Sequence, residues 1–88
     1  MKIHHQNNEH DGEFFVLNDN GEKVAELTYF YEDEKTVNAH HTYVSDSLRG
    51  QGVADKLYQA LIAFITENSL NLHPTCSYIA RKWERDNR

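Results

Sequence analysis

The segment Val44-Ser-Asp-Ser-Leu-Arg-Gly-Gln-Gly-Val-Ala54 decides how this chain folds, because it joins a strand-like run to an amphipathic helix pattern. Residues 36–44 are rich in apolar and β-branched side chains, and residues 45–48 form a polar turn. The pattern over residues 50–68 predicts a long helix that lies across a sheet. Its apolar stripe consists of Val53, Leu57, Ala60, Leu61 and Phe64.

The start of this helix is suited to an anion. Unpaired backbone N–H groups and the positive end of the helix dipole both attract phosphate. Gly50 and Gly52 let the backbone approach an anion closely, and the guanidinium of Arg49 can fork onto phosphate oxygens. The segment therefore predicts a pyrophosphate-bearing cofactor. The alternative is that the two glycines only shape a turn and that Arg49 is solvated.

The residues before this segment predict an antiparallel meander. The turn signal Asn18-Asp-Asn-Gly21 separates an apolar run at residues 14–17 from a strand at 22–31. A second polar turn at 32–35 leads into the strand at 36–44. Successive strands with short connections pair most simply as neighbours.

The residues at the two ends complete the expected fold. Residues 70–73 predict a fourth strand, and a short helix follows from about Ser77. The result is an α+β fold with the order β-β-β-α-β-α, in one domain over residues 1–88. Residues 1–12 are polar and rich in histidine and asparagine, and we expect them to be loosely ordered.

Composition excludes several classes of function. The formal charge of −5 argues against nonspecific nucleic-acid binding, which needs a basic surface. The single cysteine fits a reducing compartment. The chain shows neither a signal-peptide core nor a transmembrane run, so we expect a cytoplasmic protein without a membrane partner. No Cys/His spacing is typical of a metal site, and we expect none.

Arg49-x-x-Gly52-x-Ala54 resembles the acyl-coenzyme A motif of the GNAT superfamily of N-acetyltransferases, (Gln/Arg)-x-x-Gly-x-(Gly/Ala). The order strand, turn, helix also matches, and the resemblance covers roughly residues 13–84. The chain looks like the very short, single-domain bacterial branch, which lacks the helical N-terminal segment of full-length members. The resemblance implies a minimal GNAT-like fold and acetyl-CoA as cosubstrate.

The resemblance also implies which residues hold acetyl-CoA. The pyrophosphate would lie on the backbone N–H groups of residues 49–54, and the pantetheine arm would pair like a strand beside residues 42–44. A bulge usually splays two parallel strands at this point in the superfamily. The cofactor-binding residues so implied are Thr42, Tyr43, Val44, Arg49, Gly50, Gln51, Gly52, Val53 and Ala54.

Transfer of an acetyl group to an amine needs a base, and His41 is a candidate because imidazole titrates near neutral pH. Strict alternation over residues 36–44 places His41 and Tyr43 on the face of Val37 and Ala39. It places His40 on the opposite face. The alternative is that His41 is merely packed or solvated on the sheet.

Two further residues near the last helix are candidates for catalysis. Cys76 lies where the strand gives way to that helix, and helix N–H groups would lower its pKa, which makes a covalent acetyl-cysteine route conceivable. The superfamily often uses a tyrosine to protonate the leaving thiolate, but that position falls on Trp83. Tyr78 could substitute only from a different geometry. A buried, inert Cys76 is the alternative.

The favoured function is therefore an acetyl-CoA-dependent N-acetyltransferase acting on a primary amine of a small molecule, a protein lysine or a terminus. Its acceptor site would be open or completed by a second subunit, and we expect a monomer or a weak homodimer. A second hypothesis is a non-catalytic acyl-CoA sensor or carrier, and a third is an interaction domain without a ligand.

Overall fold

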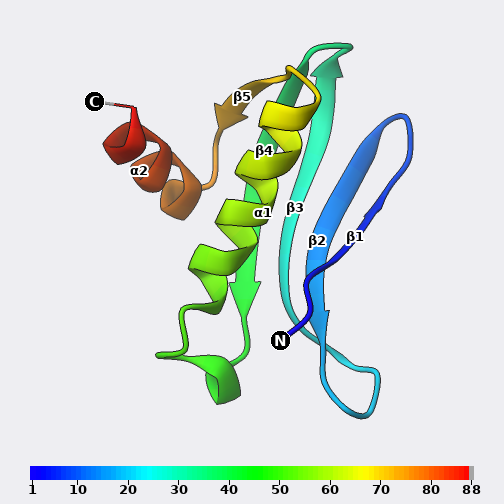
Figure 1. Cartoon of the computed structure of the whole chain (residues 1–88), viewed down its shortest axis with the longest axis vertical. Helices are drawn as coiled ribbons and strands as arrows, with labels where there is room; N and C mark the ends of the chain where they lie inside the picture. The colour runs from blue at the N-terminus through cyan, green and yellow to red at the C-terminus, as the bar shows by residue number, and fades with distance from the viewer. Residues whose placement is uncertain (88) are drawn as a thin grey trace.

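The computed structural model describes residues 1–87 as one sheet with two helices (Figure 1). The sheet has five strands in the order β1-β2-β3-β4-β5, and α1 runs across one face of it. This mixed architecture confirms the predicted α+β class. The elements are β1 (His4–Asn7), β2 (Asp11–Leu17), β3 (Lys23–Asp33), β4 (Thr36–Val44), the 3₁₀ turn η1 (Asp46–Leu48), α1 (Val53–Glu67), β5 (Asn71–Pro74) and α2 (Ser77–Asp86).

The strand pairing follows from the length of the connections. Short turns join β1 to β4 as an antiparallel meander, and the predicted turn after Asn18 is present, with Gly21 at a φ of 79°. The connection from β4 to β5 passes through α1, so these two strands are parallel. The parallel pair is short and ends at Ala39 and Pro74.

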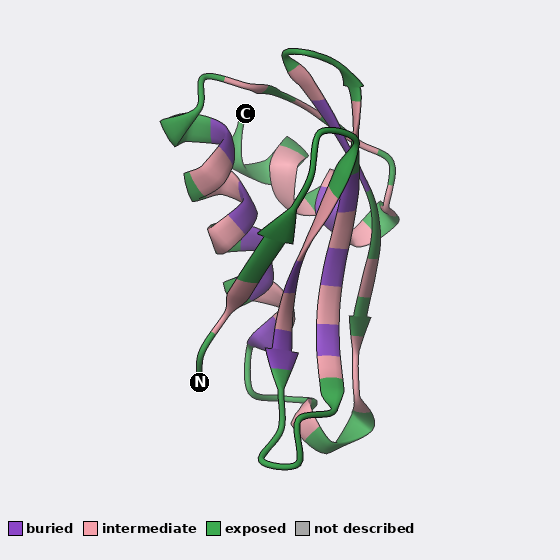
Figure 2. Ribbon diagram, turned by 90° about the vertical axis from the view of Figure 1, so that its right-hand side faces the viewer, coloured by how far each residue is buried: buried purple, intermediate pink, exposed green. Residues whose placement is uncertain are grey.

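The core lies between the sheet and α1. Ala25, Leu27 and Tyr29 alternate along β3 and are completely buried, and Leu57 and Leu61 of α1 meet them. The intervening residues of β3 point to the other side, so Figure 2 shows buried and partly exposed bands alternating along the strand. We call the side of the sheet that α1 covers the inner face and the opposite side the outer face.

Strand β1 corrects the expectation that residues 1–12 are loosely ordered and bear no strand. His5 stacks on Phe14 with ring centroids 4.1 Å apart, and its Nε2 lies 2.7 Å from the hydroxyl of the buried Tyr29. Gly12 makes room for this contact, because a Cβ there would lie 2.3 Å from the Tyr29 hydroxyl oxygen. The polar composition of the segment conceals these long-range aromatic contacts.

The predicted faces of β4 are wrong beyond Ala39, because the strand contains a bulge. Thr28 of β3 pairs with His41 and the next residue, Tyr29, pairs with Ala39, so His40 is an extra residue. After the bulge, each side chain of β4 therefore lies on the face opposite to the one that regular alternation predicts. The inner face of β4 consists of Val37, Ala39, Thr42 and Val44, and the outer face carries His41 and Tyr43.

The limits of α1 also differ from the expected range of 50–68. The helix begins at Val53, because Gly50 and Gly52 both adopt positive φ angles and belong to the turn before it. At its other end the left-handed residue is Ser69, with a φ of 53°, which directly follows the C-cap residue Asn68. Within residues 1–87, neither helix has the length and apolar character needed to cross a bilayer.

Candidate functional site

The turn between β4 and α1 has a backbone that requires glycine at two positions. Gly50 has a φ of 81° and Gly52 a φ of 71°. Residues with a Cβ avoid this left-handed region of φ, whereas glycine adopts it readily. Apart from its two chain neighbours, a Cβ at either position would meet no atom of the described residues within 4 Å, so conformation and not packing requires these glycines. The turn thus keeps an open surface beside its backbone.

The start of α1 leaves backbone donors available. The first hydrogen bond of the helix runs from the N–H of Lys56 to the carbonyl of Gly52 at 3.1 Å, and no side chain within residues 1–87 caps the start of the helix. The N–H groups of Val53, Ala54 and Asp55 therefore lie outside the helical ladder. Such donors, together with the helix dipole, are the elements of an anion site.

Arg49 lies at the same place with its side chain at the surface. Its Nε is 2.9 Å from a carboxylate oxygen of Asp46, and the two side chains are 76% and 87% exposed. An ion pair so exposed contributes little to stability. Arg49 can therefore leave Asp46 for a phosphate group at small cost.

A pocket of about 230 Å³ lies against this turn. Six of the nine residues predicted to bind the cofactor line it, and Thr42, Tyr43 and Gln51 do not. Two other lining residues, Leu48 and Asp55, were not predicted to bind the cofactor. Tyr78 of α2 lines the pocket as well. The lining residues are Val44, Leu48, Arg49, Gly50, Gly52, Val53, Ala54, Asp55 and Tyr78.

The end of β4 beside this pocket has an open edge. Its pairing with β5 stops at Ala39, whose carbonyl accepts hydrogen bonds from the N–H groups of both Thr75 and Cys76 at 3.0 Å. The N–H of Ser45 donates to Val24 of β3, so the backbone groups of Val44 face the opposite edge. Among the described residues no strand pairs with that edge beyond Ala39.

Cys76 lies in the gap where β4 and β5 part. Its Sγ is 3.4 Å from the hydroxyl oxygen of Thr42, and the residue precedes the first turn of α2. Burial raises the pKa of the thiol, but the Thr42 hydroxyl and the backbone N–H groups of Ile79 and Tyr78 outweigh burial, so the pKa lies below its usual value. The structure thus brings Cys76 and Thr42 together.

His41 lies on the other side of the sheet, so the structure does not bring it together with Cys76. Its Nε2 is 3.1 Å from a carboxylate oxygen of Glu26 on β3. His40 is also on the outer face and not opposite His41 as expected, because its ring contacts Thr28 and Phe30. Sequence reasoning missed Glu26, since only the register across the bulge reveals this neighbour.

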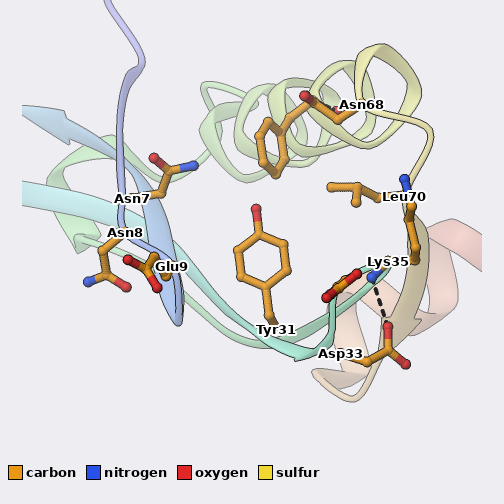
Figure 3. Close-up of a pocket in the computed structure, with 10 residues that line it drawn as sticks. Asn7, Asn8, Glu9, Tyr31, Asp33, Lys35, Asn68 and Leu70 are labelled. Carbon is orange, nitrogen blue, oxygen red and sulfur yellow. Dashed lines mark hydrogen bonds between the residues drawn. The ribbon is translucent and has the colours of Figure 1, made fainter.

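Another hollow lies at the far end of α1 and shares no residue with the motif. It has a volume of about 660 Å³, and Figure 3 shows the Tyr31 ring at its centre, between Asn7 and Leu70. Lys35 of its wall directly precedes β4, and the motif follows the other end of that strand. Since a strand rises by about 3.3 Å per residue, roughly 26 Å separate the two places.

The described part of the chain has no cluster of side chains that could bind a metal ion. Within residues 1–87, no group of three or more His, Cys, Asp or Glu residues is arranged to hold a metal ion.

Comparisons with known proteins place the chain in a family. A family model described as GCN5-related N-acetyltransferase matches residues 13–88. The protein NATD1 of Xenopus tropicalis is 43% identical over 63 residues, which are 72% of this chain and 57% of NATD1. NATD1 of Danio rerio is 35% identical over 82 residues, which are 90% of this chain and 74% of that protein. The chain thus spans a little over half of the frog relative.

Solved structures share the fold. A GCN5-like protein from Staphylococcus aureus has a TM-score of 0.75 and 34% identity, covering 98% of this chain and 80% of that one. The aminoglycoside N-acetyltransferase AAC(6′)-Iy, in complex with CoA, has a TM-score of 0.64 and 18% identity. That match covers 90% of this chain and 67% of AAC(6′)-Iy, and it shows the fold alone.

Proposed function

This chain belongs to the GCN5-related N-acetyltransferases, and from that premise we propose that it transfers the acetyl group of acetyl-CoA to a primary amine. One observation carries the proposal: free helix N–H groups and an unpaired strand edge lie at the same end of the molecule. The first suits a diphosphate and the second suits an amide-containing arm. Acetyl-CoA has both.

The diphosphate of acetyl-CoA would occupy the pocket before α1. Val53 and Ala54 line this pocket with N–H groups that lie outside the helical ladder, and Arg49, another lining residue, supplies a positive charge. AAC(6′)-Iy, which shares this fold, was solved with CoA. That complex supports CoA as a ligand of the fold.

The pantetheine arm would extend the sheet along the open edge of β4. Its amide groups would pair with the backbone of Val44 and Thr42, which faces this edge. The thioester would then lie near the gap between β4 and β5. A backbone N–H at that gap would stabilise the oxyanion that forms on the thioester carbonyl.

The acceptor would approach from the outer face, which neither of the two helices within residues 1–87 covers. A hollow of about 550 Å³ lies there beside the bulge, with Asp11, Glu13 and His40 in its wall. Carboxylates attract a protonated amine. The open shape accommodates a protein lysine or a terminal amine as readily as a small molecule.

In direct transfer the amine nitrogen attacks the thioester carbon, a C–N bond forms, and the C–S bond of acetyl-CoA breaks. His41, oriented by Glu26, would take the proton from the amine. The departing CoA thiolate regains a proton from solvent or from a nearby acid. Tyr78 stays a candidate for that acid.

An acetyl-cysteine route is the alternative mechanism. The Cys76 thiolate would attack the thioester carbon and displace CoA thiolate, and the amine would then attack the new thioester and release Cys76. The lowered pKa of the thiol favours this route. Alanine in place of Cys76 would then abolish turnover while it spares acetyl-CoA binding, and wild-type rates would exclude the route.

A non-catalytic acyl-CoA sensor is the second candidate function. The observation that favours it is Trp83 at the position where the superfamily often has its tyrosine acid. Indole cannot protonate a thiolate usefully. A sensor would bind acetyl-CoA and release no thiol with any amine.

The decisive experiment compares two glycines at which an alanine would meet a similar backbone strain. Gly52 and Gly21 both have positive φ angles, and a Cβ at either would meet no atom within 4 Å, but Gly21 lies in the β2–β3 turn. Gly52→Ala and Gly21→Ala should each lower the free energy of unfolding by about 1 kcal/mol. Only Gly52→Ala should also weaken acetyl-CoA binding in isothermal titration.

Thiol release with a panel of amines then separates enzyme from sensor. Binding together with CoA release supports the acetyltransferase. Equal acetyl-CoA affinity in the two glycine variants would contradict the placement of the diphosphate.

A further inference from the structure

A buried amide lies beside the gap where β4 and β5 part. Within residues 1–87, Asn38 of β4 is the one buried amide, and no charged residue is buried. It pairs with His73 of β5, one residue before the pairing of the two strands ends at Ala39. Burial of an amide costs free energy unless its hydrogen bonds are made. The partners of Asn38 therefore show what its side chain does at this gap.

Both ends of the Asn38 amide are hydrogen-bonded. Its Nδ2 donates to a carboxylate oxygen of Glu32 at 2.8 Å, and its Oδ1 accepts a hydrogen bond from the Thr75 hydroxyl at 2.6 Å. The same Glu32 oxygen lies 2.5 Å from Nδ1 of His73. Because an ionised carboxylate only accepts hydrogen bonds, Glu32 turns the NH₂ group of Asn38 toward itself and the amide oxygen toward Thr75.

Thr75 fixes the turn that leads to Cys76. Backbone pairing between β4 and β5 ends at Pro74, which has no N–H to donate. Beyond it, the N–H groups of Thr75 and Cys76 both donate to the carbonyl oxygen of Ala39 at 3.0 Å. The hydroxyl of Thr75 adds its hydrogen bond to Asn38, so backbone and side chain together hold this turn against β4.

The thiol of Cys76 depends on this turn for its surroundings. Cys76 directly follows Thr75 and is the N-cap residue of α2. Its Sγ lies 3.4 Å from the Thr42 hydroxyl oxygen, and backbone N–H groups of the first turn of α2 also donate to it. A shift of the turn would move the sulfur away from these donors, which stabilise the thiolate.

We propose that Asn38 is a positioning residue, which acts through Thr75 to hold the Cys76 thiol at the start of α2. Glu32 and His73 orient the Asn38 amide, and the amide fixes Thr75. The effect on catalysis rests on the proposed function, because the acetyl thioester would lie at the same gap. The position of the thiol itself needs no ligand, so it is tested without acetyl-CoA.

The test follows alkylation of Cys76, the single cysteine of the chain, by iodoacetamide as a function of pH. Thr75→Val keeps the shape of the side chain and removes the hydroxyl. Its midpoint should move toward 9.0, the ordinary thiol value. Its rate at pH 7, relative to the plateau at high pH, should fall at least about threefold, as for the loss of one hydrogen bond.

Two further variants test whether Asn38 acts through Thr75. Asn38→Leu should have the same effect as Thr75→Val, and Thr75→Ser, which keeps the hydroxyl, should behave as the wild-type chain. The double variant of Asn38→Leu and Thr75→Val should be no slower than either single variant, because the two changes break one contact.

The matched control loses stability without touching the turn. Val16→Ala truncates a buried side chain of β2, two strands away from β4. It should lower the urea midpoint and leave the pH profile of alkylation unchanged, and circular dichroism should show that each variant is folded. Profiles of Thr75→Val and Asn38→Leu that superimpose on the wild-type profile, or an additive effect in the double variant, would overturn the inference. Absence of acetyl-CoA binding by the wild-type chain would instead contradict the proposed function, and the alkylation result would stand.

Discussion

Deletion of one residue from the pair His40-His41 should leave the fold almost as stable as before. The deletion gives Ala39-His-Thr42, so a histidine still faces Thr28 while Ala39 and Thr42 keep the inner face. The chain loses only the surface contacts of the bulged residue, which are a 3.3 Å contact with Thr28 and a ring contact with Phe30. Since cross-strand pairs contribute about 0.2–1 kcal/mol each, we expect a loss of about 1 kcal/mol in the free energy of unfolding.

Deletion of Thr28 from β3 is the matched control, because β3 has no extra residue there. The shortened strand must turn either Leu27 and Ala25 or Tyr29 away from the core. Exposure of a buried leucine alone costs about 2–5 kcal/mol. Urea denaturation followed by circular dichroism measures both variants, and a histidine deletion as damaging as the Thr28 deletion would refute the bulge.

The same deletion also tests what the bulge does for binding. A bulge bends its strand, and removing it should straighten β4 next to the point where β5 departs. We therefore expect acetyl-CoA affinity to fall at least tenfold, about 1.4 kcal/mol, in a folded chain. Unchanged affinity by isothermal titration would show that the bulge does not shape the open edge.

Two further predictions follow from close contacts. Gly12→Ala should lower the free energy of unfolding by about 1–3 kcal/mol, because its Cβ would collide with the buried Tyr29 ring. An unchanged urea midpoint would show that the Tyr29 side chain can move aside without loss of stability. The rate of Cys76 alkylation should rise with pH around a midpoint below the ordinary thiol value of 9.0, since the thiol pKa is lowered. Thr42→Val should move that midpoint upward by removing a hydroxyl that stabilises the thiolate, and superimposed pH profiles would contradict this.

Local patterns were sufficient for most of the architecture. Alternation along residues 22–31, the turn at Asn18 and the apolar stripe of α1 are short-range signals, and each predicted element exists. The motif at residues 49–54 is local as well. Its glycines and its free helix N–H groups could therefore be inferred before any tertiary contact was known.

The candidate catalytic residues were harder to place. A bulge depends on which residues face each other across two strands, and nothing in the order of residues 36–44 marks His40 as extra. The prediction therefore placed His41 on the inner face, where the structure places Thr42. Strand β1 was missed for a related reason, because its stability comes from contacts with Phe14 and the distant Tyr29.

The sequence by itself determined the family, the order of the strands and helices after residue 12, and the glycine turn that precedes α1, because these depend on neighbours a few residues apart. The tertiary structure decided the register of β4, the ion pair of His41 with Glu26, and the contact between Cys76 and Thr42. Register is set by packing between strands, and a shift of one residue moves every following side chain to the other face.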